Sequence, residues 1–126
     1  MRKEDFKKKL SSEEYNVLRE KGTERPFSSE LLKEKRKGNF VCKACGNVIF
    51  DSKTKFDSGT GWPSFYDARK NSVKIKNDFS MGIPRKEVIC LKCGSHLGHV
   101  FDDGPKEKTG KRYCINGVAL GFKKKN

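Results

Sequence analysis

The pattern of apolar and polar residues divides the chain into two parts. In the first part, Ser11 is suited to be the N-cap of a helix, and Glu14 lies three residues further on, where it completes a capping box. Gly22 is suited to ending this helix, and a second helix is predicted over residues 28–38. Residues 10–38 are therefore predicted to form short N-terminal helices.

The second part, from about residue 39 to residue 122, consists of short apolar runs separated by Gly, Pro, Asn and Asp. This pattern predicts a small antiparallel β domain. The predicted strands cover residues 39–42, 48–50, 72–76, 79–83, 87–91, 99–101, 111–115 and 118–122. The Lys-rich segments 7–9 and 123–125 are predicted to be solvated and frayed.

Composition limits how much stability a core alone can supply. The chain has 126 residues, enough for one domain over residues 1–126, but only 33% of them are hydrophobic. We therefore expect a modest core that needs an additional cross-link. The formal net charge is +13, which favours acidic partners and solubility but specifies no chemistry.

No segment approaches the roughly 18 apolar residues that cross a bilayer, and the first residues contain no apolar stretch typical of a secretory signal. We therefore expect an intracellular, cytoplasmic protein with no membrane partner. No long apolar surface pattern calls for a second copy, so a monomer is expected. In a reducing cytosol, five cysteines indicate metal binding or catalysis rather than disulfides.

Four of the five cysteines occur in two copies of one turn, Cys42-Lys-Ala-Cys45-Gly and Cys90-Leu-Lys-Cys93-Gly. Each turn points two thiolates at one centre, and two such turns complete the tetrahedron that Zn²⁺ prefers. Residues 46–89 separate the pairs, a longer span than the roughly 15–20 residues of zinc ribbons. We therefore predict that two distant hairpins meet at a structural zinc ion that clamps the fold.

These four cysteines could instead be unrelated buried thiols or a pair of redox-active dithiols. The repeated Cys-x-x-Cys-Gly frame argues against unrelated thiols. Four thiolates close the coordination shell, so the metal would contribute folding free energy, on the order of 10 kcal/mol as in zinc-finger peptides, and no chemistry. Catalysis then has to come from other residues.

The fifth cysteine, Cys114, lies in a predicted strand over residues 111–116. The two-residue period of a strand places Arg112, Cys114 and Asn116 on one face. A neighbouring guanidinium favours the thiolate, so we predict a lowered pKa for the Cys114 thiol. A lone cysteine is more often a small buried residue, but this environment is that of a nucleophile.

Both histidines lie in one short segment. In a strand, His99, Phe101 and Asp103 share a face, which predicts a carboxylate close enough to orient the His99 imidazole. His96 is expected to join from the preceding loop. Trp62, the only tryptophan, is flanked by glycines and a proline, which predicts an irregular loop that holds its ring at a surface.

Three motifs, interleaved with the two Cys-x-x-Cys turns, closely resemble those of the methionine-(R)-sulfoxide reductases of the B type. They are Gly-Trp-Pro-Ser-Phe at 61–65, His-Leu-Gly-His-Val-Phe at 96–101 and Arg-Tyr-Cys-x-Asn at 112–116. The resemblance covers about residues 10–122. It implies a mainly β fold of two packed antiparallel sheets, clamped by a four-cysteine zinc site, with an active site in an open basin.

The resemblance also implies the reaction. The substrate is methionine-R-sulfoxide, free or within an oxidised protein, and the Cys114 thiolate attacks its sulfur. The oxygen is protonated through His99, His96 or a water that they hold, while Arg112 supports the thiolate. Methionine leaves, and Cys114 becomes a sulfenic acid.

The resemblance assigns four further residues to this site. Asp103 and Asn116 orient the proton network, and Trp62 and Phe101 form apolar walls around the substrate's methyl group. Many members of the family carry a resolving cysteine in the glycine-rich loop before residue 61, where this chain has Thr60. We therefore predict a one-cysteine enzyme that an external thiol regenerates, thioredoxin being favoured over glutaredoxin or glutathione.

Two further classes of function compete with this one. A zinc-knuckle nucleic-acid-binding protein would explain the positive charge, but its basic residues should cluster between aromatics, and here they are spread along the chain. A guanine-exchange or chaperone-like binding module on a similar sheet would leave Cys114 dispensable.

Overall fold

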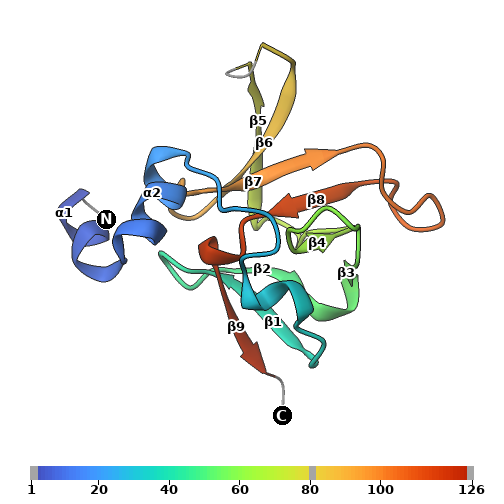
Figure 1. Ribbon diagram of the computed structural model, residues 1–126, viewed down its shortest axis with the longest axis horizontal. Coiled ribbons are helices and arrows are strands. Elements are labelled where there is room, and N and C mark those ends of the chain that lie inside the picture. The colour runs from blue at the N-terminus through green and yellow to red at the C-terminus, as the bar shows by residue number, and fades with distance from the viewer. Residues whose placement is uncertain (1–2, 80–81, 125–126) are drawn as a thin grey trace.

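In the computed structural model, which describes residues 3–79 and 82–124, the strands form two antiparallel sheets and the helices are short (Figure 1). This confirms the predicted mainly β architecture. The smaller sheet has the strand order β2-β1-β9. Its strands are β1 (Gly38–Cys42), β2 (Val48–Asp51) and β9 (Leu120–Lys124).

The larger sheet has the order β3-β4-β8-β7-β6-β5, and its β5–β6 hairpin extends away from the rest of the molecule (Figure 1). Its strands are β3 (Lys55–Phe56), β4 (Ser64–Phe65), β5 (Val73–Asp78), β6 (Arg85–Cys90), β7 (His96–Phe101) and β8 (Arg112–Ile115). β3 and β4 were not predicted because two residues are too few to show a period.

The prediction of a strand over 79–83 is wrong for the residues of this segment that the structure describes. Phe79 and Ile83 lie outside any strand and are exposed, and residues 80 and 81 lie outside the described part of the chain. Apolar character alone suggested a strand here, although these side chains have no core to cover. The predicted strand over 118–122 begins late, because a 3₁₀ turn (Gly117–Ala119) precedes β9.

The first predicted helix is confirmed as α2 (Ser12–Glu20), with Ser11 as N-cap and a complete capping box to Glu14. The second is wrong: only a 3₁₀ turn (Glu30–Lys33) forms, and Ser29 caps it. Its charged sequence offers only Leu31 and Leu32 for burial, which is too little to stabilise a longer helix.

The prediction that segments 7–9 and 123–125 are frayed is also wrong where they are described, because residues 7–9 end helix α1 (Lys3–Lys9) and Lys123 and Lys124 end β9. Their side chains are exposed, as predicted, and residue 125 lies outside the described part of the chain. Phe6 of helix α1 is 2% exposed. A further 3₁₀ turn (Ser52–Thr54) follows β2. None of the helices within residues 3–79 and 82–124 has the length and apolar character that crossing a membrane requires.

Aromatic rings join the two sheets in the core. Phe50 of the smaller sheet stacks on Phe65 of the larger one at 4.1 Å between ring centroids, and Phe40 meets Phe65 edge-on at 5.0 Å. All three rings are fully buried. Such pairs contribute about 0.5–1.5 kcal/mol each beyond their burial. The aromatic cluster therefore fixes how the sheets sit against each other.

Candidate active site and metal site

The two Cys-x-x-Cys turns have the same backbone geometry. Gly46 N donates to Cys42 O at 2.8 Å, and Gly94 N donates to Cys90 O at 2.8 Å. The two glycines have φ values of 79° and 78°, which side chains rarely allow. The repeated glycine is therefore required by the left-handed backbone that closes each turn.

The two turns bring their four sulfur atoms together. The Sγ atoms of Cys42, Cys45, Cys90 and Cys93 all lie within 4.8 Å of one another. The Cys42–Cys93 and Cys45–Cys90 sulfur distances are 3.7 Å and 3.6 Å. A tetrahedron with metal–sulfur bonds near 2.3 Å separates its sulfurs by about 3.8 Å. These four cysteines therefore could hold a metal ion.

The sulfur cluster also joins the two sheets, as the sequence predicted. Cys42 ends β1 of the smaller sheet, and Cys90 ends β6 of the larger one. The N-terminal helices support it: Lys9 Nζ donates to Ala44 O at 2.6 Å, and Arg19 Nη1 donates to Cys93 O at 3.1 Å. A cation thus lies at each turn, where it would offset the negative charge of bound thiolates.

The fifth cysteine lies in a separate cavity of about 260 Å³ beside β7 and β8. The structure brings six of the predicted residues to its wall, namely Trp62, His99, Phe101, Arg112, Cys114 and Asn116. Four further residues complete the wall. Thr23 and Arg85 were not indicated by the sequence, whereas Thr60 and Gly98 lie beside or within its motifs. His96 and Asp103 are absent from this wall.

The close packing of β7 on β8 depends on Gly98. A Cβ atom at this position would lie 2.1 Å from the Cys114 carbonyl oxygen. Gly98 pairs with Ile115, and His99 pairs with Cys114 in the next register position. A larger residue at 98 would push the strands apart, so Gly98 lets β7 place His99 opposite Cys114.

The electrostatics of Cys114 differ from the prediction. Burial raises the pKa of the Cys114 thiol, although hydrogen bonds from Thr60 and Arg112 and the charge of Arg112 act to lower it. The predicted favourable effect of Arg112 is present, but the loss of hydration is larger. The prediction of a net lowered pKa is therefore wrong for the free protein, because burial cannot be judged from a strand pattern.

Arg112 is held on two sides. Its Nε and Nη2 donate to Asp103 at 2.9 Å and 3.2 Å, and its guanidinium lies 4.5 Å from the Phe101 ring centroid. Asp103 is 65% exposed, and Arg112 lowers the pKa of its carboxyl. Asp103 therefore contacts Arg112, while the carboxylate beside His99 comes from elsewhere.

A β-bulge places both histidines on one face of β7. Val88 pairs with Gly98, but the next residue, Ile89, pairs with His96, so Leu97 is the extra residue. In a regular strand, residues three apart point to opposite faces. With the bulge, the rings of His96 and His99 lie 5.4 Å apart. His96 is thus the first residue of β7, and the prediction that it lies in a loop is wrong.

Each histidine contacts a carboxylate that the sequence pattern did not indicate. His99 Nε2 lies 2.8 Å from Asp78 Oδ2, and His96 Nδ1 lies 2.7 Å from Glu87 Oε2. His96 is 5% exposed, and burial lowers the pKa of its imidazole. The two acids precede the histidines by 21 and 9 residues, so only strand pairing identifies them.

Glu24, which the sequence pattern also did not indicate, connects the segment after α2 to the cavity. Its carboxylate accepts hydrogen bonds from the backbone N–H groups of Gly117 at 2.7 Å and Val118 at 2.9 Å. Its own backbone binds two predicted residues: its N–H donates to Asn116 Oδ1, and its carbonyl accepts from Trp62 Nε1, both at 3.0 Å. Burial raises the pKa of the Glu24 carboxyl.

Asn116 is therefore committed to the backbone. Besides accepting from Glu24, its side chain donates through Nδ2 to Leu97 O at 3.1 Å. The Trp62 ring is held at the cavity wall by its hydrogen bond to Glu24 O, in the irregular loop that the sequence predicted. These contacts set the shape of the cavity.

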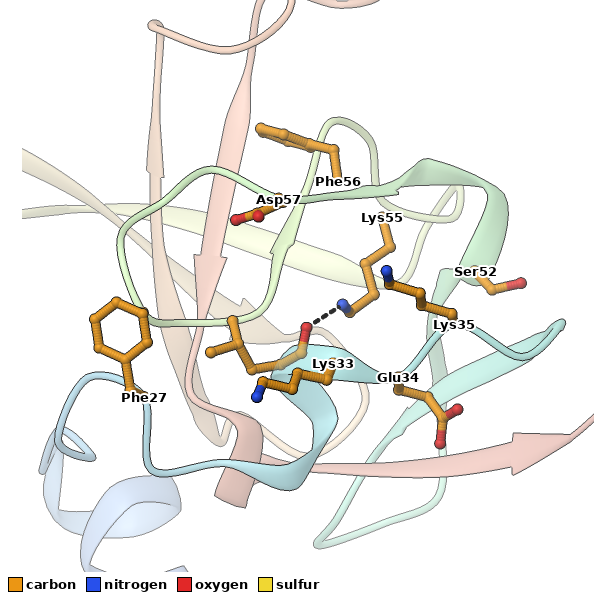
Figure 2. A pocket seen from close by; sticks show the side chains of 10 residues that line it. Phe27, Lys33, Glu34, Lys35, Ser52, Lys55, Phe56 and Asp57 are labelled. Atoms are coloured by element: carbon orange, nitrogen blue, oxygen red, sulfur yellow. Dashed lines mark hydrogen bonds between the residues drawn. The ribbon is translucent and has the colours of Figure 1, made fainter.

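A larger groove, of about 760 Å³, is lined by Phe27, Leu32, Lys55 and their neighbours and contains neither Cys114 nor a histidine (Figure 2). Lys55 Nζ donates to Leu32 O at 2.7 Å, the bond dashed in Figure 2, and burial lowers the pKa of this amine. The groove meets the loop of Trp62 at Asp57 and Gly61, whereas Cys114 and His99 line the smaller cavity.

Comparison with known proteins shows the family to which this chain belongs. The model of the SelR domain matches residues 10–124. The chain belongs to the SelR domain family. It is similar to the peptide methionine sulfoxide reductase MsrB of Methanosarcina barkeri, at 60% identity over 121 residues, which cover 95% of this chain and 84% of that protein.

Two further relatives come from other organisms. MsrB of Leptospira interrogans is 55% identical over 122 residues, covering 96% of this chain and 92% of that one. The chloroplastic peptide methionine sulfoxide reductase B1 of Arabidopsis thaliana is 54% identical over 117 residues, covering 92% of this chain and 57% of that protein. The family indicated by the three sequence motifs is therefore confirmed.

A solved structure, the Mis18 'Yippee-like' domain, shares the fold of this SelR domain. The two superpose with a TM-score of 0.58 at 21% identity, over 72% of this chain and 99% of that one. At this level of identity, the likeness concerns the fold alone.

Proposed function

We propose that this protein reduces methionine-R-sulfoxide, within oxidised proteins and as the free amino acid, to methionine, with Cys114 as the nucleophile. Membership of the family supports reduction of methionine sulfoxide. The observation that carries the finer assignment is the cavity in which the Cys114 thiol, the His99 imidazole and the Trp62 ring meet. A thiol, a proton donor and an apolar surface are what this substrate requires.

The reaction balances with the groups in this cavity. The Cys114 thiolate attacks the sulfoxide sulfur while a proton reaches the sulfoxide oxygen. The attack forms a bond between Cys114 Sγ and the substrate sulfur. This bond and the sulfur–oxygen bond of the substrate then break as the oxygen passes to Cys114, which becomes a sulfenic acid. Methionine leaves reduced by two electrons, and Cys114 is oxidised by two. Trp62 and Phe101 line the cavity and would contact the methyl group of the substrate.

His99 is a better proton donor than His96. His99 lines the cavity, and its neighbour across the β7–β8 ladder is Cys114. His96 is almost fully buried against Glu87, and burial lowers the pKa of its imidazole, which favours the neutral form at neutral pH. We assign proton donation to His99 and support of the strand to His96.

Thiolate formation at Cys114 needs Arg112 and Thr60. Because burial raises the pKa of the free thiol, these two hydrogen-bonding residues offset part of the penalty on the anion. Asp103 holds Arg112 from outside, and Asn116 keeps the end of β8 in place. Thr60, Arg112 and Asn116 act by orienting the nucleophile and its partners, whereas Asp103 lies at the exposed rim.

The sulfenic acid is regenerated by an external thiol. The other four cysteines are gathered in the sulfur cluster, and Thr60 occupies the loop position beside Cys114. One external thiol displaces water from the sulfenic acid to form a mixed disulfide, and a second thiol releases Cys114. A dithiol protein such as thioredoxin supplies both thiols. In this proposal the enzyme is a single-domain monomer that works in the cytoplasm.

The metal of the four-cysteine cluster is Zn²⁺ in this proposal. The sulfur distances fit a tetrahedral ion, and four thiolates leave no position for substrate. The ion would clamp the two sheets and take no part in the reaction. The nucleic-acid-binding alternative is not favoured, because it gives no role to the Cys114 cavity.

The decisive assay uses the separated R and S epimers of a blocked methionine sulfoxide with dithiothreitol as reductant. We expect turnover of the R epimer only, and a loss on the order of 10³-fold or more for Cys114→Ser. Turnover of neither epimer, or of the S epimer alone, would refute the proposal.

A second measurement addresses regeneration. After substrate is added without reductant, mass spectrometry should find one added oxygen on Cys114, or its dimedone adduct, with zinc still bound. An intramolecular disulfide with zinc retained would show instead that a second cysteine of this chain resolves the intermediate.

A further inference from the structure

Asp78 is buried at the end of β5, and its carboxylate reaches the histidine of the cavity. It is 8% exposed, and its Oδ2 lies 2.8 Å from His99 Nε2. The same oxygen accepts from Arg85 Nη2 at 3.3 Å. Asp78 and Arg85 face each other in the last register position of the β5–β6 ladder, so the hairpin brings the Asp78 carboxylate to His99 with Arg85 bound to it.

This contact determines which ring nitrogen of His99 carries a hydrogen. An ionised carboxylate only accepts hydrogen bonds, so Nε2 must be the N–H donor to Asp78. The other nitrogen, Nδ1, is then the one available to a ligand of the cavity that His99 lines. A carboxylate that fixes the tautomer and ring orientation of a catalytic histidine has a large effect on the rate in other enzymes.

The neighbouring pair makes the assignment more specific. His96 binds its carboxylate, Glu87, through Nδ1, whereas His99 binds Asp78 through Nε2. The two rings on one face of β7 are therefore held by opposite nitrogens, and only His99 also reaches the cavity wall. The strand pattern had placed Asp103 beside His99, but Asp103 contacts Arg112.

We propose that Asp78, anchored by Arg85, is a positioning residue that fixes the His99 ring so that Nδ1, which bears the second hydrogen when the imidazole is protonated, can donate that proton to the substrate oxygen. Arg85 itself lines the cavity, so it holds the carboxylate from the side of the substrate. The assignment rests on the proposed role of His99 as proton donor, and it makes the β5–β6 hairpin part of the active site.

The first test needs no activity. In the zinc-loaded, full-length protein, long-range ¹H–¹⁵N NMR spectra distinguish the two tautomers of each histidine. We expect His99 to carry its hydrogen on Nε2 when neutral, and Asp78→Asn to reduce this preference, because an amide can also donate. A native His99 with its hydrogen on Nδ1 would overturn the proposal, whether or not the enzyme is active and whether or not the variant folds.

The second test measures the reduction of the R epimer of a blocked methionine sulfoxide at saturating reductant. Asp78→Asn should lower kcat by at least roughly 10-fold, which is part of the roughly 10²–10⁴-fold that general acid catalysis supplies, with KM nearly unchanged. Asp78→Glu should recover part of the rate. The control is Asp102→Asn, since Asp102 is exposed and binds only Lys111 among the contacts described.

The results separate the positioning role from the proposed function. If the native protein reduces the R epimer and Asp78→Asn retains its kcat, Asp78 does not position a catalytic group. If the native protein reduces neither epimer, the proposed function fails, while the NMR spectra still report whether Asp78 fixes His99. A loss in Asp78→Asn that appears as raised KM at unchanged kcat would also contradict the proposal, because it would indicate a binding role.

Discussion

The sulfur cluster and the Cys114 cavity both depend on cysteines, but they are built in different ways. The cluster comes from two copies of one turn, with matching hydrogen bonds and matching left-handed glycines. The cavity collects side chains from several strands and from the segment after α2. One site repeats a local structure, whereas the other exists only once the sheets have packed.

The difference shows which kind of site can be read from a sequence. A Cys-x-x-Cys-Gly turn carries its own geometry within five residues, so its chemistry is local. Cys114 gains its chemistry from Arg112, Thr60 and His99, whose effects depend on distances and burial. The two sites should therefore respond differently to mutation.

The largest effect is expected at the cluster. Cys90→Ser should unfold the protein, because losing a structural zinc site removes on the order of 10 kcal/mol, comparable to the whole stability of a small domain. Cys114→Ser is the matched control and should melt near the native temperature. Circular dichroism melting and zinc content measure this contrast. A zinc-free Cys90→Ser variant with native melting would show that the cluster is not a clamp.

The next effect concerns the scaffold of the cavity. Glu24→Ala should lower the free energy of unfolding by about 1–3 kcal/mol, because two backbone N–H groups lose their buried acceptor. Trp62 fluorescence should change as well, since its Nε1 binds the Glu24 backbone. Glu107→Ala, at an exposed position, is the control. Unchanged stability and emission would mean that Glu24 does not hold the cavity together.

A smaller effect is expected in the pH dependence of stability. Because burial lowers the pKa of folded His96, the unfolded chain takes up a proton first as the pH falls below about 6.5. The contribution of His96 to the free energy of unfolding is therefore present above that pH and lost below it. Urea titrations at a series of pH values measure this effect. His96→Asn should remove the loss of stability that His96 causes below about pH 6.5, and His99→Asn should retain it. A steeper loss in His96→Asn would contradict the assignment.

The smallest effect is expected at the rim. Asp103→Asn should change stability by less than about 1 kcal/mol, because its ion pair with Arg112 is largely exposed on the carboxylate side. The pH profile of Cys114 alkylation should stay nearly constant. Arg112→Ala should move that profile to higher pH, since Arg112 lowers the pKa of the thiol. Equal shifts in both variants would place Asp103 in the catalytic network, as the sequence suggested.

The sequence predicted the parts of the molecule whose geometry is local. The capping box of α2, the two Cys-x-x-Cys turns and the face shared by Arg112 and Cys114 each follow from spacings of a few residues. Periodicity also indicated most of the strands of both sheets. It overestimated the helix after Ser29, because helix-favouring residues without an apolar face do not hold a helix in a fold.

Only the tertiary structure decided how the Cys114 site is completed. The bulge at Leu97 puts His96 and His99 on one face, and strand pairing gives His99 the carboxylate of Asp78 rather than that of Asp103. The raised pKa of the Cys114 thiol likewise comes from burial, which opposes the nearby cation. Register, burial and long-range contact are set by how the sheets pack, whereas a tight turn is set by its own few residues.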